Sequence, residues 1–236
     1  MKKRMHYFTF AELCLWIGSV FFIILSFFMF DKTNYITLLA SVIGVTSLIF
    51  NAKGNPIGQV LMIVFSVLYG IISYSFSYFG EMITYLGMTA PMALWALVSW
   101  LKNPYNGNMS EVTVNSVSKK EILFMLLLSA VATVIFYFIL HALGTHNLLP
   151  STLSVTTSFI AAYLTARRSP YFALAYAAND IVLIVLWVLA AFYNSSYISV
   201  IICFVAFLIN DLYGFLNWKK IQQKQKSPDR KSAGNL

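Results

Sequence analysis

The chain has 236 residues, of which 59% are hydrophobic and only 10% are charged, and its mean hydropathy is +0.75. Soluble domains average about 25% charged residues, so this composition excludes a water-soluble enzyme, a disordered chain and a disulfide scaffold. The 16 Lys and Arg residues outnumber the 8 Asp and Glu residues and give a formal net charge of +8. The composition is that of an integral membrane protein.

Apolar segments long enough to cross the bilayer recur along the whole chain. About 20 helical residues span the hydrocarbon core, and the segments are continuously apolar, which favours helices over barrel strands. The sequence predicts eight transmembrane helices, at Leu13–Phe30, Ile36–Phe50, Pro56–Phe79, Met82–Trp100, Ile122–Leu143, Leu149–Ala166, Tyr171–Phe192 and Ile198–Trp218.

The basic residues alternate between the segments that connect these helices. If the N-terminus is cytoplasmic, the predicted cytoplasmic segments hold every Lys and Arg except Lys32. Because cytoplasmic loops carry an excess of Lys and Arg, we expect a multi-pass protein of the cell membrane with both termini in the cytoplasm. The charge of +8 therefore records topology and lipid contact, and no nucleic-acid partner is expected.

Two stretches of the chain resemble one another. Asn55-Pro56 and Ser169-Pro170 each open a helix after a short cytoplasmic turn, and the helix that closes each stretch ends in Trp100 or Trp218. These marks predict two parallel three-helix units in an all-α membrane protein arranged 1+3+1+3. We expect each of three tryptophans to anchor a helix end at the membrane interface: Trp16, Trp100 and Trp218.

Five regions follow from this arrangement. Residues 1–35 hold the cytoplasmic N-terminus and an extra helix, and residues 36–100 form the first unit. Residues 101–148 form a cytoplasmic loop and a linker helix, 149–218 the second unit, and 219–236 a basic cytoplasmic tail.

Two carboxyl groups lie inside predicted helices, where a charge costs about 2.5 to 3.5 kcal/mol on insertion scales. Helical spacing groups aromatic and amide side chains around Asp180 and Asp211, and a second polar stripe runs along the first unit. Facing one another, these stripes would line a central path for a neutral or cationic, partly planar solute with hydroxyl groups. Hydrogen bonds between helices are the alternative role for these groups. The candidate binding residues are Tyr176, Asn179, Asp180, Asn210, Asp211, Tyr213, Tyr69, Gln59, Tyr85, Trp95, Phe172 and Trp187.

The paired units, the run Ala166–Pro170, the run Tyr176–Asp180 and the run Asn210–Gly214 followed by Trp218 resemble the PnuC family of vitamin and nucleoside transporters. The resemblance implies a fold similar to that of the SWEET sugar transporters, with 3+1+3 helices and an additional N-terminal helix. It implies import of nicotinamide riboside by facilitated diffusion, followed by trapping through a cytoplasmic kinase. No cofactor or metal is implied.

The substrate remains open among several solutes. Nicotinamide riboside transporters of this family carry a Trp-x-x-Trp motif where this chain has Tyr171–Tyr176, without Trp. A (deoxy)nucleoside or thiamine is therefore the alternative substrate. An intramembrane enzyme that uses Asp180 and Asp211 as an acid and base pair is a remote alternative, since no HExxH or GxSxG motif is present. The sequence also leaves open whether copies assemble into a homo-oligomer.

Overall fold

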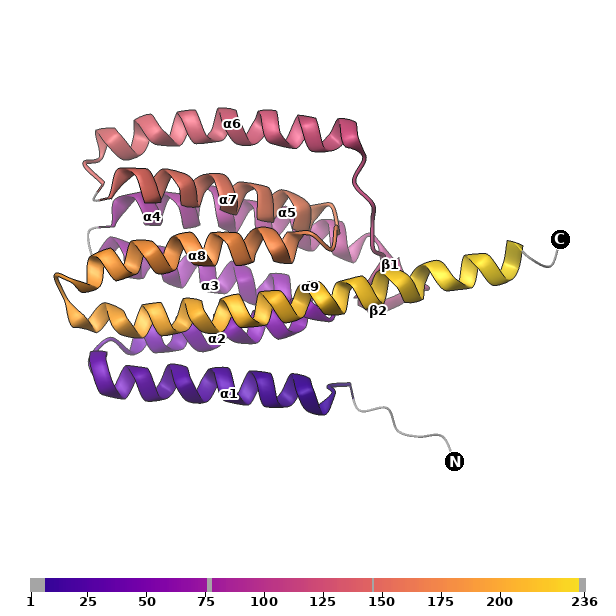
Figure 1. Cartoon of the computed structure of the whole chain (residues 1–236), viewed down its shortest axis with the longest axis horizontal. Helices are drawn as coiled ribbons and strands as arrows, with labels where there is room; N and C mark the ends of the chain where they lie inside the picture. The colour runs from indigo at the N-terminus through magenta and orange to yellow at the C-terminus, as the bar shows by residue number, and fades with distance from the viewer. Residues whose placement is uncertain (1–6, 76–77, 146, 234–236) are drawn as a thin grey trace.

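The computed structural model describes residues 7–75, 78–145 and 147–233, with side chains described up to residue 227. Within these residues, eight helical segments are long and apolar enough to cross a membrane, as the sequence predicts. They lie side by side in one bundle, and the chain enters and leaves at the same end of it (Figure 1). We call this the basic end, because the helix ends there carry Lys53, Lys102, Arg167 and Lys219. The basic residues at 2–4 lie outside the described part.

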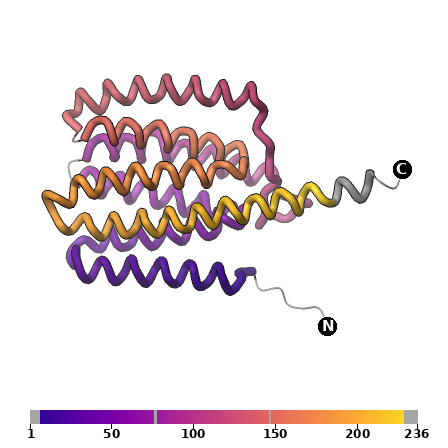
Figure 2. Tube along the Cα trace, viewed as in Figure 1, coloured from indigo at the N-terminus to yellow at the C-terminus, as the bar shows by residue number. Residues whose placement is uncertain are grey.

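Figure 2 traces the chain through the bundle by colour. The first membrane-spanning segment is α1 (Phe10–Ser26), extended by the π-helical η1 (Phe27–Asp31), and the fourth joins α4 (Phe79–Ile83), the π-helical η2 (Thr84–Thr89) and α5 (Ala90–Leu101). The other helices are α2 (Tyr35–Ala52), α3 (Ile57–Ser75), α6 (Lys119–Ala142), α7 (Leu148–Ala166), α8 (Phe172–Ala191) and α9 (Ile198–Ala233), with a 3-10 turn η3 (Ser195–Tyr197) before α9.

A hairpin of β1 (Pro104–Tyr105) and β2 (Asn108–Val112) joins α5 to α6, where the sequence analysis expected only a loop. Its turn is Asn106-Gly107, both with positive φ, and an Asn-Gly pair is a strong signal for a two-residue hairpin turn.

The last helix also continues beyond the predicted end at Trp218. Residues 219–227 contain no Gly or Pro and are mostly Lys and Gln, which favour helix. The side-chain amide of Gln225 accepts from the Val114 N–H at 2.8 Å and donates to the Val112 carbonyl at 3.1 Å. The first part of the predicted basic tail is therefore a helical extension docked on the hairpin region.

Six spans form the centre of the bundle and two lie at its edges. α2 packs against α3 and α9, α7 packs against α6 and α8, and α5 joins α3 to α7. Only 22% of the α1 span and 11% of the α6 span are buried, against 56% for α2 and for α7. α1 and α6 lie on opposite sides of the bundle (Figure 1), so each covers one edge.

We call α2 to α5 the first unit and α7 to α9 the second unit, after the two groups of helices that the sequence predicts. Trp100 and Trp218, at the membrane-spanning ends of these units, make matching contacts between them. Trp100 Nε1 donates to the carbonyl of Thr165, at the end of α7, and Trp218 Nε1 donates to that of Asn51, at the end of α2, at 2.8 and 2.7 Å. The preceding residues do the same, Ser99 to the Ala166 carbonyl and Asn217 to the Ala52 carbonyl.

Both tryptophans are fully buried, and their ring centroids lie 5.4 Å apart. Their predicted role as interface anchors is therefore wrong, because the other unit, and not the lipid headgroups, satisfies each indole N–H. Trp16 is partly exposed and donates to Thr46 of α2.

Gly44 marks a close approach of three helices. A Cβ added there would collide with the ring of Phe207 on α9 and reach within 2.9 Å of the ring of Phe65 on α3. We therefore expect Gly44→Ala to destabilise the fold by about 1–3 kcal/mol through overpacking, seen as a lower Tm. Gly18→Ala on α1 is the matched control, since nothing lies within 4 Å of that position. Equal Tm values for the two variants would contradict the close packing.

Candidate substrate site

A small cavity of about 30 Å³ lies between the two units in the middle of the bundle. Helices α2 and α3 and the π-helical η2 line it from the first unit, and α7, α8 and α9 line it from the second. Its lining residues are Leu48, Met62, Phe65, Tyr85, Thr89, Ser158, Tyr176, Asn179, Asp180, Phe204, Phe207 and Asp211.

The structure brings five of the predicted binding residues together at this cavity. Tyr176, Asn179 and Asp180 come from α8, Asp211 from α9, and Tyr85 from η2. Both carboxyl groups are buried, with Asp180 3% and Asp211 5% exposed.

The two carboxyl groups interact directly with one another. Asp180 Oδ2 receives no hydrogen bond from a donor in the part of the chain that the structure describes. Two carboxyl groups in contact in a site of low dielectric cannot both ionise unless a proton or a cation lies between or beside them. The electrostatics of the cavity therefore suit a positively charged ligand.

Polar groups beside the carboxyl pair can bind hydroxyl groups. Asn179 Oδ1 accepts hydrogen bonds from the hydroxyls of Thr157 and Ser158 at 2.8 and 2.9 Å. These bonds fix the orientation of the amide, and its NH₂ group is then the donor that Asn179 offers to a ligand. The neighbouring Ser158 hydroxyl and Thr89 also line the cavity.

The first unit contributes its polar groups from an irregular stretch of helix. Tyr85 and Thr89 belong to η2, where the helix widens just before Pro91. Proline lacks the N–H that a regular helix needs, and π-helical turns are frequent at functional sites. The Thr89 hydroxyl donates to the Thr84 carbonyl at 3.2 Å, so side chain and backbone are tied together within the widened turn.

An aromatic layer closes the cavity on the side away from the basic end. Tyr69 lies 4.3 Å from Tyr85 and 6.3 Å from Trp187 between ring centroids. Trp187 in turn contacts Tyr78 and Tyr197, at 5.1 and 5.3 Å. Tyr69 and Trp187, both predicted to bind substrate, therefore lie in this far aromatic layer and not at the cavity itself.

A second aromatic layer closes the side toward the basic end. Phe172, also a predicted binding residue, packs at 4.9 Å against Trp218 and at 6.4 Å against Trp100 between ring centroids. We call these three rings the near aromatic layer. Known ligand pockets measure about 300–1,000 Å³, so the 30 Å³ cavity is too small to hold a solute of that size in this state.

The remaining predicted residues lie away from the cavity. Gln59 donates to the Asn51 side chain at 2.8 Å, and the Trp95 side chain is 46% exposed. Asn210 donates to Ser19 of α1 at 2.9 Å, and the Tyr213 hydroxyl donates to Glu12 of α1 at 3.1 Å.

Several cavity residues escaped the sequence analysis. Phe65 and Phe204 are two of the 20 Phe residues of the chain, and nothing in the sequence distinguishes a lining ring from a packed one. Phe207 is one of the aromatic residues that helical spacing groups around Asp211, but it was not among the candidate binding residues. Ser158 belongs to a Ser- and Thr-rich helix, and that richness was the only signal for it. No group of three or more His, Cys, Asp or Glu side chains that could hold a metal ion occurs among the described residues.

A polar site between two helical units, closed on both sides by aromatic layers, defines a membrane transporter of small solutes. A family profile described as "Nicotinamide mononucleotide transporter" matches residues 34–220, from the start of α2 to just beyond Trp218. The chain therefore belongs to this transporter family, and α1 lies outside the matched region.

Two curated relatives carry the name nicotinamide riboside transporter PnuC. The chain is 25% identical to the one from Neisseria mucosa over 84% of this chain and 76% of the relative. It is 22% identical to the one from Haemophilus influenzae over 86% and 88%. A crystal structure of the vitamin B3 transporter PnuC has the same fold, with a TM-score of 0.81, 23% identity, and coverage of 92% of this chain and 94% of that one.

Proposed function

We propose that the protein carries nicotinamide riboside through the central cavity by facilitated diffusion. The observation that carries the proposal is the buried pair of carboxyl groups, Asp180 and Asp211, beside aromatic rings. Nicotinamide riboside has a planar pyridinium ring with a fixed positive charge and a ribose with free hydroxyls. The names of the curated relatives support the same solute.

Each part of this solute has a chemical partner at the cavity. Tyr85 and Tyr176 offer ring faces to the pyridinium, and cation–π contact adds to stacking. One carboxylate of the Asp180 and Asp211 pair balances the positive charge. Asn179, Ser158 and Thr89 supply donors and acceptors for the ribose hydroxyls.

The carboxyl pair also favours some of the alternative substrates over others, according to their charge. Thiamine has a cationic thiazolium ring, so it remains a candidate on charge. A neutral nucleoside or deoxynucleoside has no charge for a carboxylate to pair with, so the carboxyl pair would add less to its binding. We therefore favour a cationic solute over a neutral one.

Transport proceeds in this proposal by rocking one unit against the other. The near and far aromatic layers open in turn, so that the site faces one side of the membrane at a time. The basic end faces the cytoplasm of a cell-membrane protein, in agreement with the excess of Lys and Arg there. The solute moves without coupled ions, and a cytoplasmic kinase traps it inside.

A binding screen tests the choice of solute. Titration calorimetry of the purified protein is expected to give at least tenfold lower Kd for nicotinamide riboside than for uridine, a difference of about 1.4 kcal/mol. Thiamine is measured alongside as a second cationic solute, and inosine as a second neutral one. Uridine binding as tight as that of nicotinamide riboside would refute the role given to the carboxyl pair.

A further inference from the structure

The helix α1 belongs to neither three-helix unit, yet it buries a carboxylate at the basic end. Glu12, in its first turn, is only 1% exposed. Near Glu12, α1 faces a cavity of about 240 Å³ that separates it from α2. Apolar packing between α1 and α2 is therefore incomplete there, and polar contacts hold the helix end in place.

Glu12 first completes the start of its own helix. The Thr9 N–H donates to Glu12 Oε2 at 2.7 Å, and the Glu12 N–H donates to Thr9 Oγ1 at 3.3 Å. This reciprocal pair is a capping box, which fixes the position of the carboxylate relative to the helix axis.

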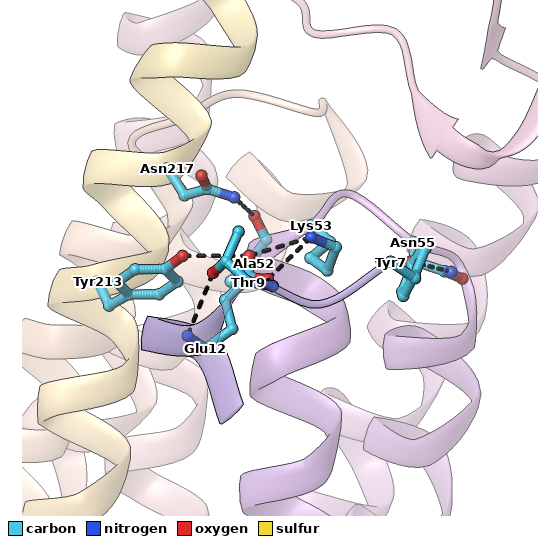
Figure 3. Close-up of polar contacts among 8 residues, drawn as sticks. All are labelled: Tyr7, Thr9, Glu12, Ala52, Lys53, Asn55, Tyr213 and Asn217. Carbon is cyan, nitrogen blue, oxygen red and sulfur yellow. Dashed lines mark hydrogen bonds and ion pairs between the residues drawn. The ribbon is translucent and has the colours of Figure 1, made fainter. Parts of the chain in front are cut away.

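The same carboxylate then reaches both units, as Figure 3 shows. Lys53 Nζ, at the end of α2 in the first unit, lies 3.0 Å from both carboxylate oxygens. The hydroxyl of Tyr213, on α9 in the second unit, donates to Glu12 Oε1 at 3.1 Å. One carboxylate therefore joins the end of α2 to the middle of α9, and these two helices belong to different units.

Neighbouring contacts reinforce this junction. The Asn217 side chain, one turn after Tyr213, donates to the Ala52 carbonyl at 2.8 Å (Figure 3). Before Thr9, the Tyr7 hydroxyl accepts from Asn55 at 2.6 Å, and Lys53 Nζ lies 5.0 Å from the centre of the Tyr7 ring.

At the opposite edge of the bundle, α6 has a similar carboxylate in its first turn, but that carboxylate does not link the two units. Glu121, in the first turn of α6, follows the capping residue Ser118 and pairs with Arg167 at the end of α7. Its remaining neighbour is Tyr163, also on α7. In the described part of the chain, Glu121 thus bonds to α6 itself and to the second unit, and does not reach the first unit.

We propose that Glu12 is a positioning residue that clasps the two units together at the basic end and so opposes opening on that side. This inference rests on the proposed alternating access. When the end of α2 moves away from the Tyr213 turn of α9, one carboxylate cannot keep both Lys53 and Tyr213, so opening breaks a buried contact. Loss of the clasp shifts the protein toward the state open at the basic end.

Labelling of buried cysteines tests the clasp in the full chain. In a Cys14→Ser, Cys203→Ala background, Ala173→Cys reports on the near aromatic layer and Ala190→Cys on the other end of α8; both alanines are buried. The Glu12→Gln variant is expected to react with N-ethylmaleimide about fivefold faster or more at position 173, as one or two kcal/mol changes a population ratio 5- to 30-fold. At position 190 the labelling rate of Glu12→Gln is expected to equal that of its parent or to be lower.

Two further variants complete the design. Glu121→Gln removes a comparable ion pair and is expected to leave the rate at position 173 unchanged. Tyr213→Phe keeps the ion pair but removes the bond to the second unit, and is expected to raise the rate at position 173.

Equal rates at position 173 for Glu12→Gln and its parent would overturn the proposal, as would equal effects of Glu12→Gln and Glu121→Gln. A rise at both reporter positions would also overturn it, because general loosening and not directional opening would be the cause. The labelling experiment tests only the role proposed for Glu12. Uptake of nicotinamide riboside by the parent decides the proposed function, so the two failures are told apart.

Discussion

Replacing Asp180 by Asn is expected to weaken the binding of nicotinamide riboside by about tenfold to a hundredfold. A hydrogen bond or contact to a charged group contributes about 1.5–3 kcal/mol, and each 1.4 kcal/mol is a factor of ten in Kd. Asn has nearly the same shape as Asp, so the change removes charge with little loss of packing. Calorimetric titration of the purified variant measures the effect.

The proposed role of the Asp180 charge leads to a second prediction for the same variant. Binding of uridine, which has no positive charge for the carboxylate to balance, should change far less in Asp180→Asn than binding of nicotinamide riboside does. Trp95→Phe is the control, since Trp95 is half exposed and lies away from the cavity. Parallel loss of nicotinamide riboside and uridine binding would show that Asp180 acts on the fold rather than on the charge of the ligand.

The Trp218→Ala variant is expected to lose about 3–5 kcal/mol of stability, as do other Trp-to-Ala changes in protein cores. The Trp218 ring is fully buried against Trp100 and Phe172, and its Nε1 donates to the Asn51 carbonyl across the boundary between the units. The change leaves a cavity and removes the hydrogen bond to the Asn51 carbonyl, which keeps its bond from the Gly54 N–H. A thermal unfolding assay should show a markedly lower Tm.

Two variants separate the contributions to this loss. Trp218→Phe keeps most of the ring and removes the indole N–H, so it should lose only about 1 kcal/mol. Trp95→Ala truncates a half-exposed tryptophan and should change the Tm far less than Trp218→Ala does. A Tm for Trp218→Ala equal to that of Trp95→Ala would place Trp218 outside the core.

The spans were predictable because each depends on a local property of the chain. A run of apolar residues indicates a membrane helix whatever its neighbours are. Asp180 and Asp211 stand out because charged residues are rare in such runs. For the same reason, the sequence located the two carboxyl groups and the Tyr176–Asp180 stretch that meet at the cavity.

The partner of each helix face was not predictable in this way. Asn210 and Asp211 are adjacent in sequence but point about 100° apart around α9. Asp211 consequently faces the cavity, while Asn210 donates to Ser19 of α1. Helical spacing identifies a polar face, but only the packing of α1 beside α9 decides which part of that face is left for a solute.

The roles of the tryptophans show the same limit. A Trp at a helix end is often an interface anchor, and nothing local to Trp100 or Trp218 indicates otherwise. Their burial arises from the meeting of the two units, where each indole finds a carbonyl on the other unit. This is a property of the assembled bundle, which no single segment encodes.

The central claim is that a cationic nucleoside-like solute passes between the two units without an energy-coupling ion. Uptake of labelled nicotinamide riboside into proteoliposomes, with the membrane potential clamped at zero, tests it directly. Uptake is expected to stop at equal concentrations inside and outside and to be unaffected by a proton gradient. An inside-negative potential of 100 mV should raise accumulation of the cation about 50-fold at equilibrium, the equivalent of about 2.3 kcal/mol per charge. Accumulation at zero potential driven by a proton gradient, or the absence of any uptake above that of empty liposomes, would contradict the account.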